Sequence, residues 1–176
     1  MKQNNYLIIV DVQKDFVDGV LGTKEAVAMI PYLVNKIKGF KGEIIFTQDT
    51  HDRDYLSTIE GKKLPVIHCV KNTPGWNFEA AIIPFIKGRK VFQKPTFGSE
   101  KLVNYIKKQH QSSPITSIEV VGICTDICVI SNVMMLKAAL PNVQIKVDAN
   151  ACAGVTPQSH MRALESMASI YIDIQK

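Results

Sequence analysis

Short runs of β-branched and aliphatic residues alternate with helical patterns along this chain, and this alternation constrains the fold more than any other feature. Strands are predicted at residues 6–10, 43–47, 90–93, 117–121, 144–147 and 169–174. Strands that alternate with helices are typical of a parallel sheet with helices on both faces. We therefore predict an α/β fold with three layers, α/β/α, in which a six-stranded, mainly parallel, Rossmann-like sheet forms the middle layer.

Helices are predicted between most of these strands. One begins at Pro31, because proline is favoured at the first helical position, and it ends before Gly39. The other helices are predicted at residues 79–86, 99–111, 127–139 and 157–167. Residues 49–77 form a long irregular connection, and such connections are usually functional or disordered.

The composition is that of an ordinary soluble domain, with 46% hydrophobic and 21% charged residues. A length of 176 residues predicts a single domain, residues 1–176. The net charge of +5 does not indicate nucleic-acid binding, because the lysines are scattered and their clusters lack aromatic neighbours. No membrane association is predicted, since the first apolar run, residues 6–10, is too short for a signal peptide or a span. Four cysteines without a secretory context favour reduced thiols in a cytoplasmic protein.

The segment from Gly122 to Ile130 places Cys128 in the first turn of a predicted buried helix. The strand at residues 117–121 ends just before it, so the thiol should lie at the carboxyl edge of the sheet, where open α/β sheets bind ligands. Unpaired N–H groups at a helix start stabilise negative charge. They are expected to lower the pKa of the Cys128 thiol and could hold an oxyanion.

Two other strand ends carry charged residues that could act on this thiol. Asp11 ends the first strand and Lys94 follows the third. An acid, a cation and a thiol would thus meet at one edge of the sheet, where the carboxylate could move the thiol proton and the lysine could stabilise a thiolate. Each residue alone has a simpler interpretation, as a turn aspartate, a surface lysine or a core cysteine. Their joint placement favours catalysis.

A second group of residues has the composition of a metal site. Asp49, His51 and His68 offer one carboxylate and two imidazoles to a divalent ion and leave coordination positions open. His68 could equally be a core residue. The remaining histidines, His110 and His160, are interpreted as helix-end or surface residues without a role.

Three aromatic residues, Phe16, Trp76 and Phe97, lie in loops at the same predicted edge. Core packing is the simplest interpretation of each, although a flat aromatic substrate would use one or two of them as walls. The segment after the first strand, residues 11–16, contains no glycine, so a dinucleotide site is not predicted.

Together the segments at residues 7–16, 47–51, 68–70 and 122–129, with Lys94, resemble the isochorismatase-like cysteine hydrolases, and within them the nicotinamidases. The resemblance implies that Cys128 is the nucleophile, Asp11 the proton acceptor and donor, and Lys94 the third member of a triad. It also implies an oxyanion hole formed by the backbone N–H groups of Cys124 and Cys128, with a cis peptide bond before Cys124.

The resemblance further implies a divalent metal ion, zinc or else manganese or iron, bound by Asp49, His51 and His68. Phe16 would form one wall of the substrate pocket. The expected reaction is deamidation of a small planar carboxamide, nicotinamide to nicotinate and ammonia, in the salvage of NAD. The resemblance also implies a homo-oligomer.

Two positions depart from the family pattern. Ser57 stands where some nicotinamidases have a further histidine, and Pro65 where an aromatic residue is common. A related hydrolase acting on a ureido acid or on an isochorismate-like substrate is therefore an alternative. Two alternatives of another class are a thiol sensor that pairs Cys124 with Cys128 and an inactive binding protein of the same fold.

Overall fold

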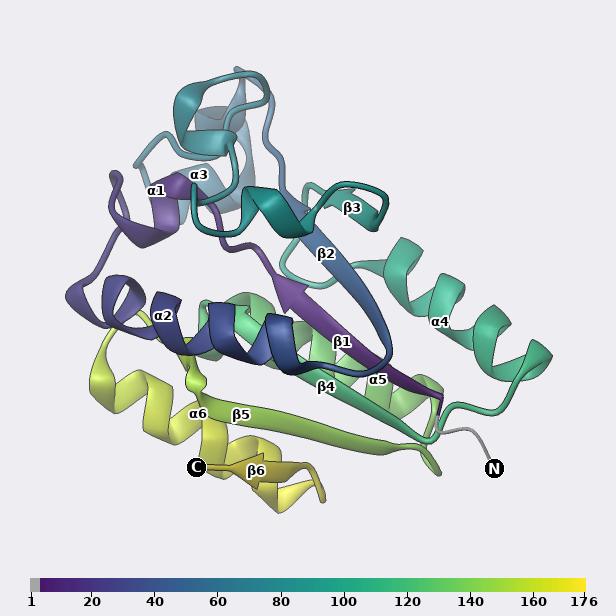
Figure 1. Ribbon diagram of the computed structural model, residues 1–176. Coiled ribbons are helices and arrows are strands. Elements are labelled where there is room, and N and C mark those ends of the chain that lie inside the picture. The colour runs from purple at the N-terminus through teal and green to yellow at the C-terminus, as the bar shows by residue number, and fades with distance from the viewer. Residues whose placement is uncertain (1–3) are drawn as a thin grey trace.

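The computed structural model describes residues 4–176, which form a six-stranded sheet with helices on both faces (Figure 1). The strands are β1 (Asn5–Val10), β2 (Glu43–Asp49), β3 (Lys90–Lys94), β4 (Ser117–Ile123), β5 (Gln144–Ala153) and β6 (Asp173–Gln175). Their order is β3-β2-β1-β4-β5-β6, and every neighbouring pair is parallel. The predicted α/β fold is confirmed.

The strand order creates a switch point between β1 and β4. From β1 the chain runs outward to β2 and β3, and it then crosses back to β4 and runs outward in the other direction. Ligands of such sheets bind in the crevice at the carboxyl ends of the strands where the order reverses. This places the residues that follow β1 and β4 at the centre of that crevice.

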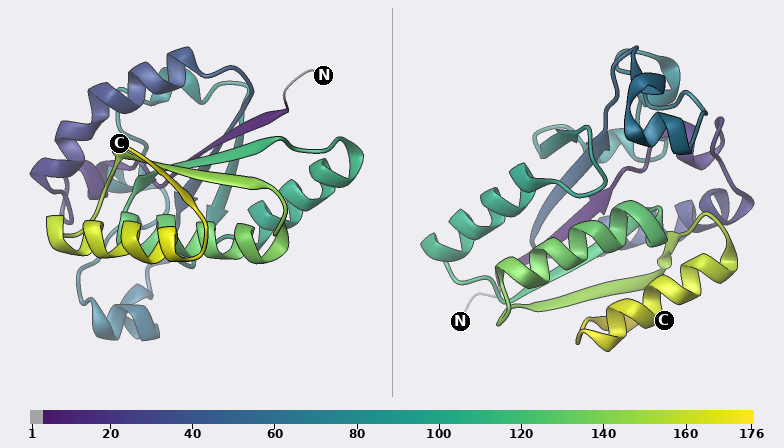
Figure 2. Two further views of the ribbon diagram at one scale, coloured as in Figure 1. Left: turned by 90° about the horizontal axis from the view of Figure 1, so that it is seen from below. Right: turned by 180° about the vertical axis from the view of Figure 1, so that it is seen from behind.

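Four long helices cover the sheet. They are α2 (Lys24–Gly39), α4 (Glu100–Ser112), α5 (Ile130–Ala139) and α6 (Pro157–Ser169). Helix α2 lies on one face, and α4, α5 and α6 lie together on the other (Figure 2). The central strand β1 is enclosed by both layers, and the side chains of residues 7–10 have no exposed surface. Because helices cover both faces of the sheet, its central strand needs apolar side chains on both sides rather than alternating apolar and polar ones.

Several boundaries differ from the predictions. Helix α2 begins at Lys24, so that Pro31 lies inside it. The Thr23 hydroxyl caps this helix by accepting from the N–H of Ala26 at 3.0 Å, and a buried stripe along its length compensates for the hydrogen bond that proline cannot donate.

Helix α5 packs on one side through Val133 and Leu136, while Met134 is partly exposed, so this helix is not buried all round.

The predicted helix at residues 79–86 is reduced to a 3₁₀ turn, Ile83–Phe85, that contains Pro84. Proline has no N–H with which to continue a helix. The last predicted strand, residues 169–174, begins too early, because α6 continues to Ser169 and the chain turns at Tyr171 with a φ of 66°. Strand β6 is confined to the sheet edge.

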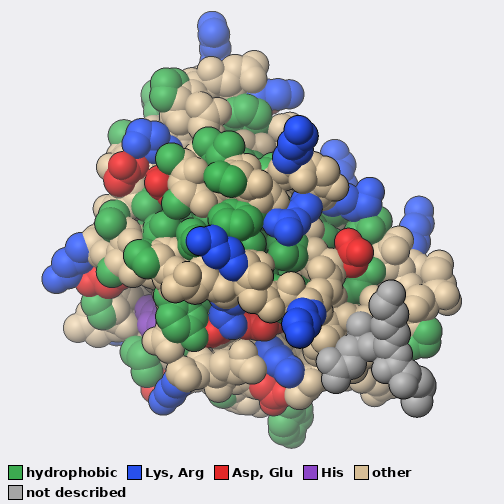
Figure 3. Space-filling view, viewed as in Figure 1, with side chains coloured by type: hydrophobic (Ala, Val, Ile, Leu, Met, Phe, Trp, Pro, Cys, Tyr) green, Lys and Arg blue, Asp and Glu red, His purple; other side chains and the backbone are tan. Residues whose placement is uncertain are grey.

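The connection at residues 50–89 forms only short elements, among them α3 (Ile59–Lys63) and two 3₁₀ turns, Tyr55–Ser57 and Pro74–Trp76. With α1 (Lys14–Val17) these elements rise above the carboxyl edge of the sheet (Figure 1). Lysine and arginine side chains are spread over the visible face rather than gathered in one patch (Figure 3). Within residues 4–176, no helix has the length and hydrophobicity to cross a membrane.

Candidate active site and metal site

The structure brings Asp11, Lys94 and Cys128 together at the carboxyl edge of the sheet. Asp11 follows β1, Lys94 ends β3, and Cys128 lies in a π-helical turn, Thr125–Val129, between β4 and α5. The Lys94 Nζ atom lies 2.5 Å from Oδ2 of Asp11 and 3.5 Å from Sγ of Cys128. All three side chains are buried. The lysine therefore bridges the carboxylate and the thiol.

The backbone around Asp11 is held by its neighbours in the sheet. Asp11 has a positive φ of 48°, and its Oδ1 atom accepts a 2.6 Å hydrogen bond from the Thr47 hydroxyl. On β4, Gly122 has a φ of 122°, and a Cβ there would lie 2.2 Å from the carbonyl oxygen of Val10. Only glycine allows this close approach of β1 and β4 beside the site. The peptide bond between Ile123 and Cys124 is cis, as the resemblance implies.

Burial dominates the electrostatics of the triad. It raises the pKa of the Cys128 thiol well above its ordinary value, and the nearby Lys94 charge offsets only part of this effect. Burial also raises the pKa of Asp11, although the charge of Lys94 lowers it in part. For Lys94 itself, burial lowers the pKa, but Asp11, Cys128 and Asp49 raise it more, so the ammonium stays charged.

Burial therefore opposes the expected lowering of the pKa of Cys128 by a helix start. The cysteine lies inside a π-helical turn rather than at the exposed start of an α-helix, and the loss of hydration outweighs the favourable charges. At rest the arrangement holds a neutral thiol beside an Asp11–Lys94 ion pair.

Asp49, His51 and His68 form a second buried cluster, in which the ligand atoms all lie within 4.8 Å of one another. The Nε2 atom of His51 is buried and lies 3.0 Å from Oδ2 of Asp49, without a well-formed hydrogen bond to any of the described residues. The Nδ1 atom of His68 lies 2.8 Å from the carbonyl oxygen of Val66, and a proton donated there leaves the lone pair of Nε2 directed at the cluster. This donor set fits a divalent ion.

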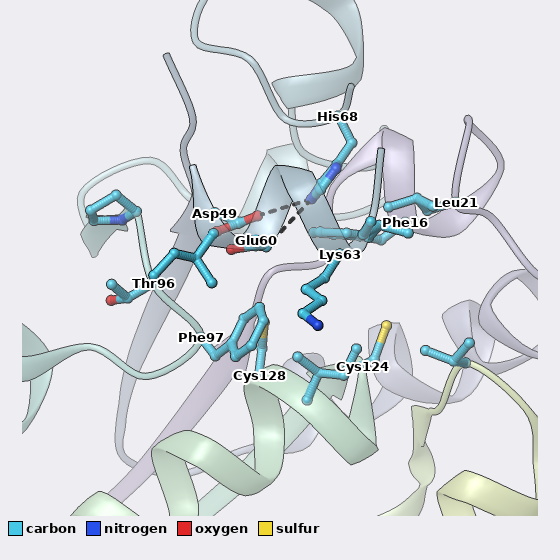
Figure 4. A pocket seen from close by; sticks show the side chains of 15 residues that line it. Phe16, Leu21, Asp49, Glu60, Lys63, His68, Thr96, Phe97, Cys124 and Cys128 are labelled. Atoms are coloured by element: carbon cyan, nitrogen blue, oxygen red, sulfur yellow. Dashed lines mark ion pairs between the residues drawn. The ribbon is translucent and has the colours of Figure 1, made fainter. Parts of the chain in front are cut away.

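Glu60 is a further acidic side chain at this cluster, and sequence reasoning missed it. It projects from α3, and its Oε1 atom lies 3.7 Å from Nε2 of His51 and 3.8 Å from Nε2 of His68 (Figure 4). Ser57, by contrast, turns away and donates a 2.7 Å hydrogen bond to the carbonyl of Asp54. Glu60 therefore faces the cluster, whereas Ser57 does not.

A pocket of about 670 Å³ opens onto Cys128, Asp49 and His68. Phe16 and Phe97 line it, in agreement with their predicted place at this edge (Figure 4). The ring of Phe16 lies 5.4 Å from that of His68, measured between centroids. The walls are largely apolar, as in sites for small organic molecules.

Trp76 and Pro65 do not line this pocket. The indole N–H of Trp76 instead donates a 2.9 Å hydrogen bond to the Thr50 hydroxyl. Pro65 is exposed, and the preceding residue, Leu64, contributes to the wall instead. At this part of the wall an aliphatic side chain therefore stands where an aromatic residue is common in the family pattern.

With this geometry established, we compared the chain with known proteins. The model of the isochorismatase domain family matches residues 5–175. The chain belongs to this family. The resemblance noted in the sequence is thereby confirmed.

Curated relatives of this family member include two nicotinamidases. The chain is 26% identical to the nicotinamidase of Schizosaccharomyces pombe, covering 96% of this chain and 91% of the relative. It is 27% identical to the nicotinamidase/pyrazinamidase of Mycobacterium tuberculosis, covering 96% of each.

Solved structures show the same fold. The nicotinamidase PncA of Bacillus subtilis matches with a TM-score of 0.82 and 22% identity, covering 99% of this chain and 100% of that one. The pyrazinamidase of Pyrococcus horikoshii in complex with zinc matches with a TM-score of 0.80 and 24% identity, covering 98% and 99%.

Gln13 of this isochorismatase-family chain fixes the backbone that carries Asp49, and sequence reasoning did not single it out. Its fully buried side chain accepts a 2.7 Å hydrogen bond from the Asp49 N–H and donates 2.9 Å bonds to the carbonyls of Asp49 and Trp76. The Asp15 carboxylate similarly accepts the N–H of Cys69 at 2.8 Å, next to His68. The sequence signal for these contacts is a glutamine directly after an apolar strand, because a buried amide must form hydrogen bonds.

His160 also differs from its predicted place on the surface. Its Nδ1 atom lies 2.8 Å from the hydroxyl of the fully buried Thr125, the first residue of the π-helical turn. The N–H of Val155 donates to Oδ1 of Asp126 at 3.1 Å. The start of α6 is thus joined by two contacts to the turn that carries Cys128.

Proposed function

We propose that this chain is an amidohydrolase that converts nicotinamide to nicotinate and ammonia. The observation that carries the proposal is the buried Lys94 ammonium placed between Asp11 and Cys128, beside a largely apolar pocket. The isochorismatase family and the nicotinamidase relatives indicate an amidohydrolase. A flat ring with one carboxamide suits the apolar walls next to these polar groups.

In the proposed first half-reaction, Asp11 takes the proton of the Cys128 thiol as the sulfur attacks the carboxamide carbon. Lys94, in contact with both groups, stabilises the negative charge as it moves from the carboxylate to the sulfur. The raised pKa of the thiol makes this proton transfer necessary, because little thiolate exists beforehand.

The backbone N–H groups of Cys124 and Cys128 are assigned to the oxyanion of the tetrahedral intermediate. A donor of this kind contributes about 3 to 4 kcal/mol in comparable sites. Asp11 then gives its proton to the departing ammonia, and a thioester to Cys128 remains. In the second half-reaction Asp11 accepts a proton from the attacking water, which releases the acid and restores the thiol.

Asp49, His51 and His68 are proposed to bind the divalent ion, with zinc as the first candidate and manganese or iron as others. An ion held by these three residues would supply Lewis-acid chemistry toward the ring nitrogen of the substrate. Glu60 faces the same point and would add a carboxylate ligand. Phe16 is proposed as one wall for the ring.

The cellular setting belongs to the same proposal. We place the protein in the cytoplasm, as one domain that forms a homo-oligomer and serves the salvage of NAD. The four cysteines, Cys69, Cys124, Cys128 and Cys152, are all free, which suits a reducing compartment.

The test is ammonia release from nicotinamide by the purified protein, with and without a chelator. Wild-type protein loaded with zinc should release ammonia. The Cys128→Ala variant should not, and Cys152→Ala, which alters a buried cysteine on β5 outside the pocket, should keep the activity. Full activity in Cys128→Ala, or none in the zinc-loaded wild type, would contradict the proposal.

A further inference from the structure

Lys63 is a charged residue of the pocket that the proposed reaction does not use. It ends α3 and lines the pocket, and its side chain runs inward toward the wall where Phe97, Cys124 and Cys128 lie (Figure 4). No ion pair or hydrogen bond joins its ammonium to another of the residues 4–176. The cation is thus available to a ligand.

The other charges around the pocket balance one another once a divalent ion is bound. The carboxylates of Asp11, Asp49 and Glu60 carry three negative charges, and a divalent ion together with Lys94 supplies three positive ones. Lys63 then remains as an unmatched positive charge. A pocket with one such charge favours a ligand with one negative charge.

The size of the pocket leaves room for more than one substituent on a ring. Its volume of about 670 Å³ lies within the range of sites for drug-sized ligands, whereas nicotinamide is one ring with one carboxamide. Ile59, Phe97 and Val155 line the pocket with side chains that are 81%, 44% and 51% exposed. These apolar side chains would cover the body of a larger substrate.

We propose that the preferred substrates are aromatic carboxamides that carry a second, anionic group, and that Lys63 binds this group. The inference rests on the proposed amidohydrolase activity and extends its substrates from nicotinamide to anionic carboxamides. Lys63 descends from α3, and Cys128 belongs to the helical segment on the other side of the pocket (Figure 4). A ring between them presents its carboxamide to Cys128 and a carboxylate to Lys63. The bond that breaks is still the amide C–N bond, and the second group is unchanged.

The experiment measures binding by calorimetry to zinc-loaded Cys128→Ala protein, in which no turnover interferes. The two ligands are 5-carbamoylnicotinate, which carries a carboxylate, and 5-nitronicotinamide, whose nitro group has the same shape without a net charge. We expect the carboxylate ligand to bind roughly three- to fivefold more tightly, because Lys63 is exposed at the pocket and solvent weakens an exposed ion pair. Added salt should reduce this preference.

The same measurement is made after Lys63→Gln and, as the matched control, after Lys62→Gln. Lys62 and Lys63 are both exposed, but only Lys63 lines the pocket. Lys63→Gln should abolish the preference for the carboxylate ligand, and Lys62→Gln should leave it within about twofold. Equal affinities in the parent protein, a preference that survives Lys63→Gln, or binding of neither ligand would overturn the inference.

Turnover of nicotinamide by the wild-type protein separates this inference from the proposed function. Ammonia release together with equal binding of the two ligands would reject the role of Lys63 and keep the amidohydrolase. A charge preference that depends on Lys63, without ammonia release from nicotinamide, would support the anionic substrate class and reject nicotinamide as the substrate.

Discussion

At the scale of single residues, the state of the proton on Cys128 determines how the site can work. Burial raises the pKa of both Cys128 and Asp11, and Lys94 contacts both side chains. A buried thiolate next to a buried carboxylate would place two negative charges against one lysine. This charge balance favours one shared ion pair and a neutral thiol at rest, and in the proposed mechanism Asp11 then acts as the base.

Replacing Asp11 with asparagine tests this dependence. Asparagine keeps the shape of the side chain but cannot accept the thiol proton, so kcat/KM for nicotinamide should fall by roughly a thousandfold. Asp18→Asn is the control, because Asp18 is an exposed aspartate that pairs with Lys14. A variant Asp11→Asn with a kcat/KM within tenfold of the wild type would show that another group takes the proton.

At the scale of elements, the β-strands place the triad, and the irregular connection after β2 supplies the rest of the site. Glu60 and Lys63 both come from α3, which the sequence pattern did not distinguish within residues 49–77. No spacing rule links Glu60 to His51, because the chain between them turns at Tyr55–Ser57 before α3 begins. The positions of these side chains are fixed by tertiary folding, and one sequence without that fold does not reveal them.

The contact between α6 and the π-helical turn should make stability depend on pH. Burial lowers the pKa of His160, and the nearby Asp126 offsets only part of this effect. The unfolded chain then binds more protons than the folded one, so this contribution to stability is full above the ordinary pKa of about 6.5 and is lost as the pH falls below it.

Urea unfolding at pH 7 and pH 5 measures this effect. The wild type should lose more stability over this interval than His160→Asn, in which the amide can replace Nδ1 of histidine as the partner of Thr125. His110→Asn on α4 serves as the histidine control, because the asparagine amide can still accept the N–H of Ile115, which His110 accepts at 3.1 Å. Equal losses of unfolding free energy in the wild type and in His160→Asn would show that His160 does not cause the pH dependence.

At the scale of the whole molecule, the features that depend on the hydrophobic core, above all the class of sheet, were the best predicted from the sequence. The central strands carry unbroken apolar runs that only a covered sheet can bury, and this made the topology class predictable. The edge strand β6 (Asp173–Gln175) has polar residues at both ends and follows a turn, so its start was misplaced. The meeting of Asp11, Lys94 and Cys128 could be predicted because parallel strands bring their carboxyl ends to one edge. The contact of His160 with Thr125 could not, because it depends on how α6 packs.

Metal binding should stabilise the whole fold, because the cluster joins β2 to the connection that follows it. Zinc at a hundred times its dissociation constant would add about 2.7 kcal/mol, which corresponds to a rise in Tm of roughly 5 to 10 °C for a chain of this size. Calorimetric melting with zinc and with a chelator measures this shift. His51→Ala should remove it, whereas His110→Ala should keep it, and an equal shift in both variants would place the metal elsewhere.

The central claim is that Cys128 forms a covalent acyl intermediate, and mass spectrometry of the intact protein tests it most directly. The protein is mixed with excess nicotinamide, quenched in acid during turnover and digested to locate any added mass. We predict a nicotinoyl group on Cys128, absent from Cys128→Ala protein treated in the same way. Turnover of nicotinamide by a Cys128→Ala variant, or a nicotinoyl group on another residue, would contradict the account.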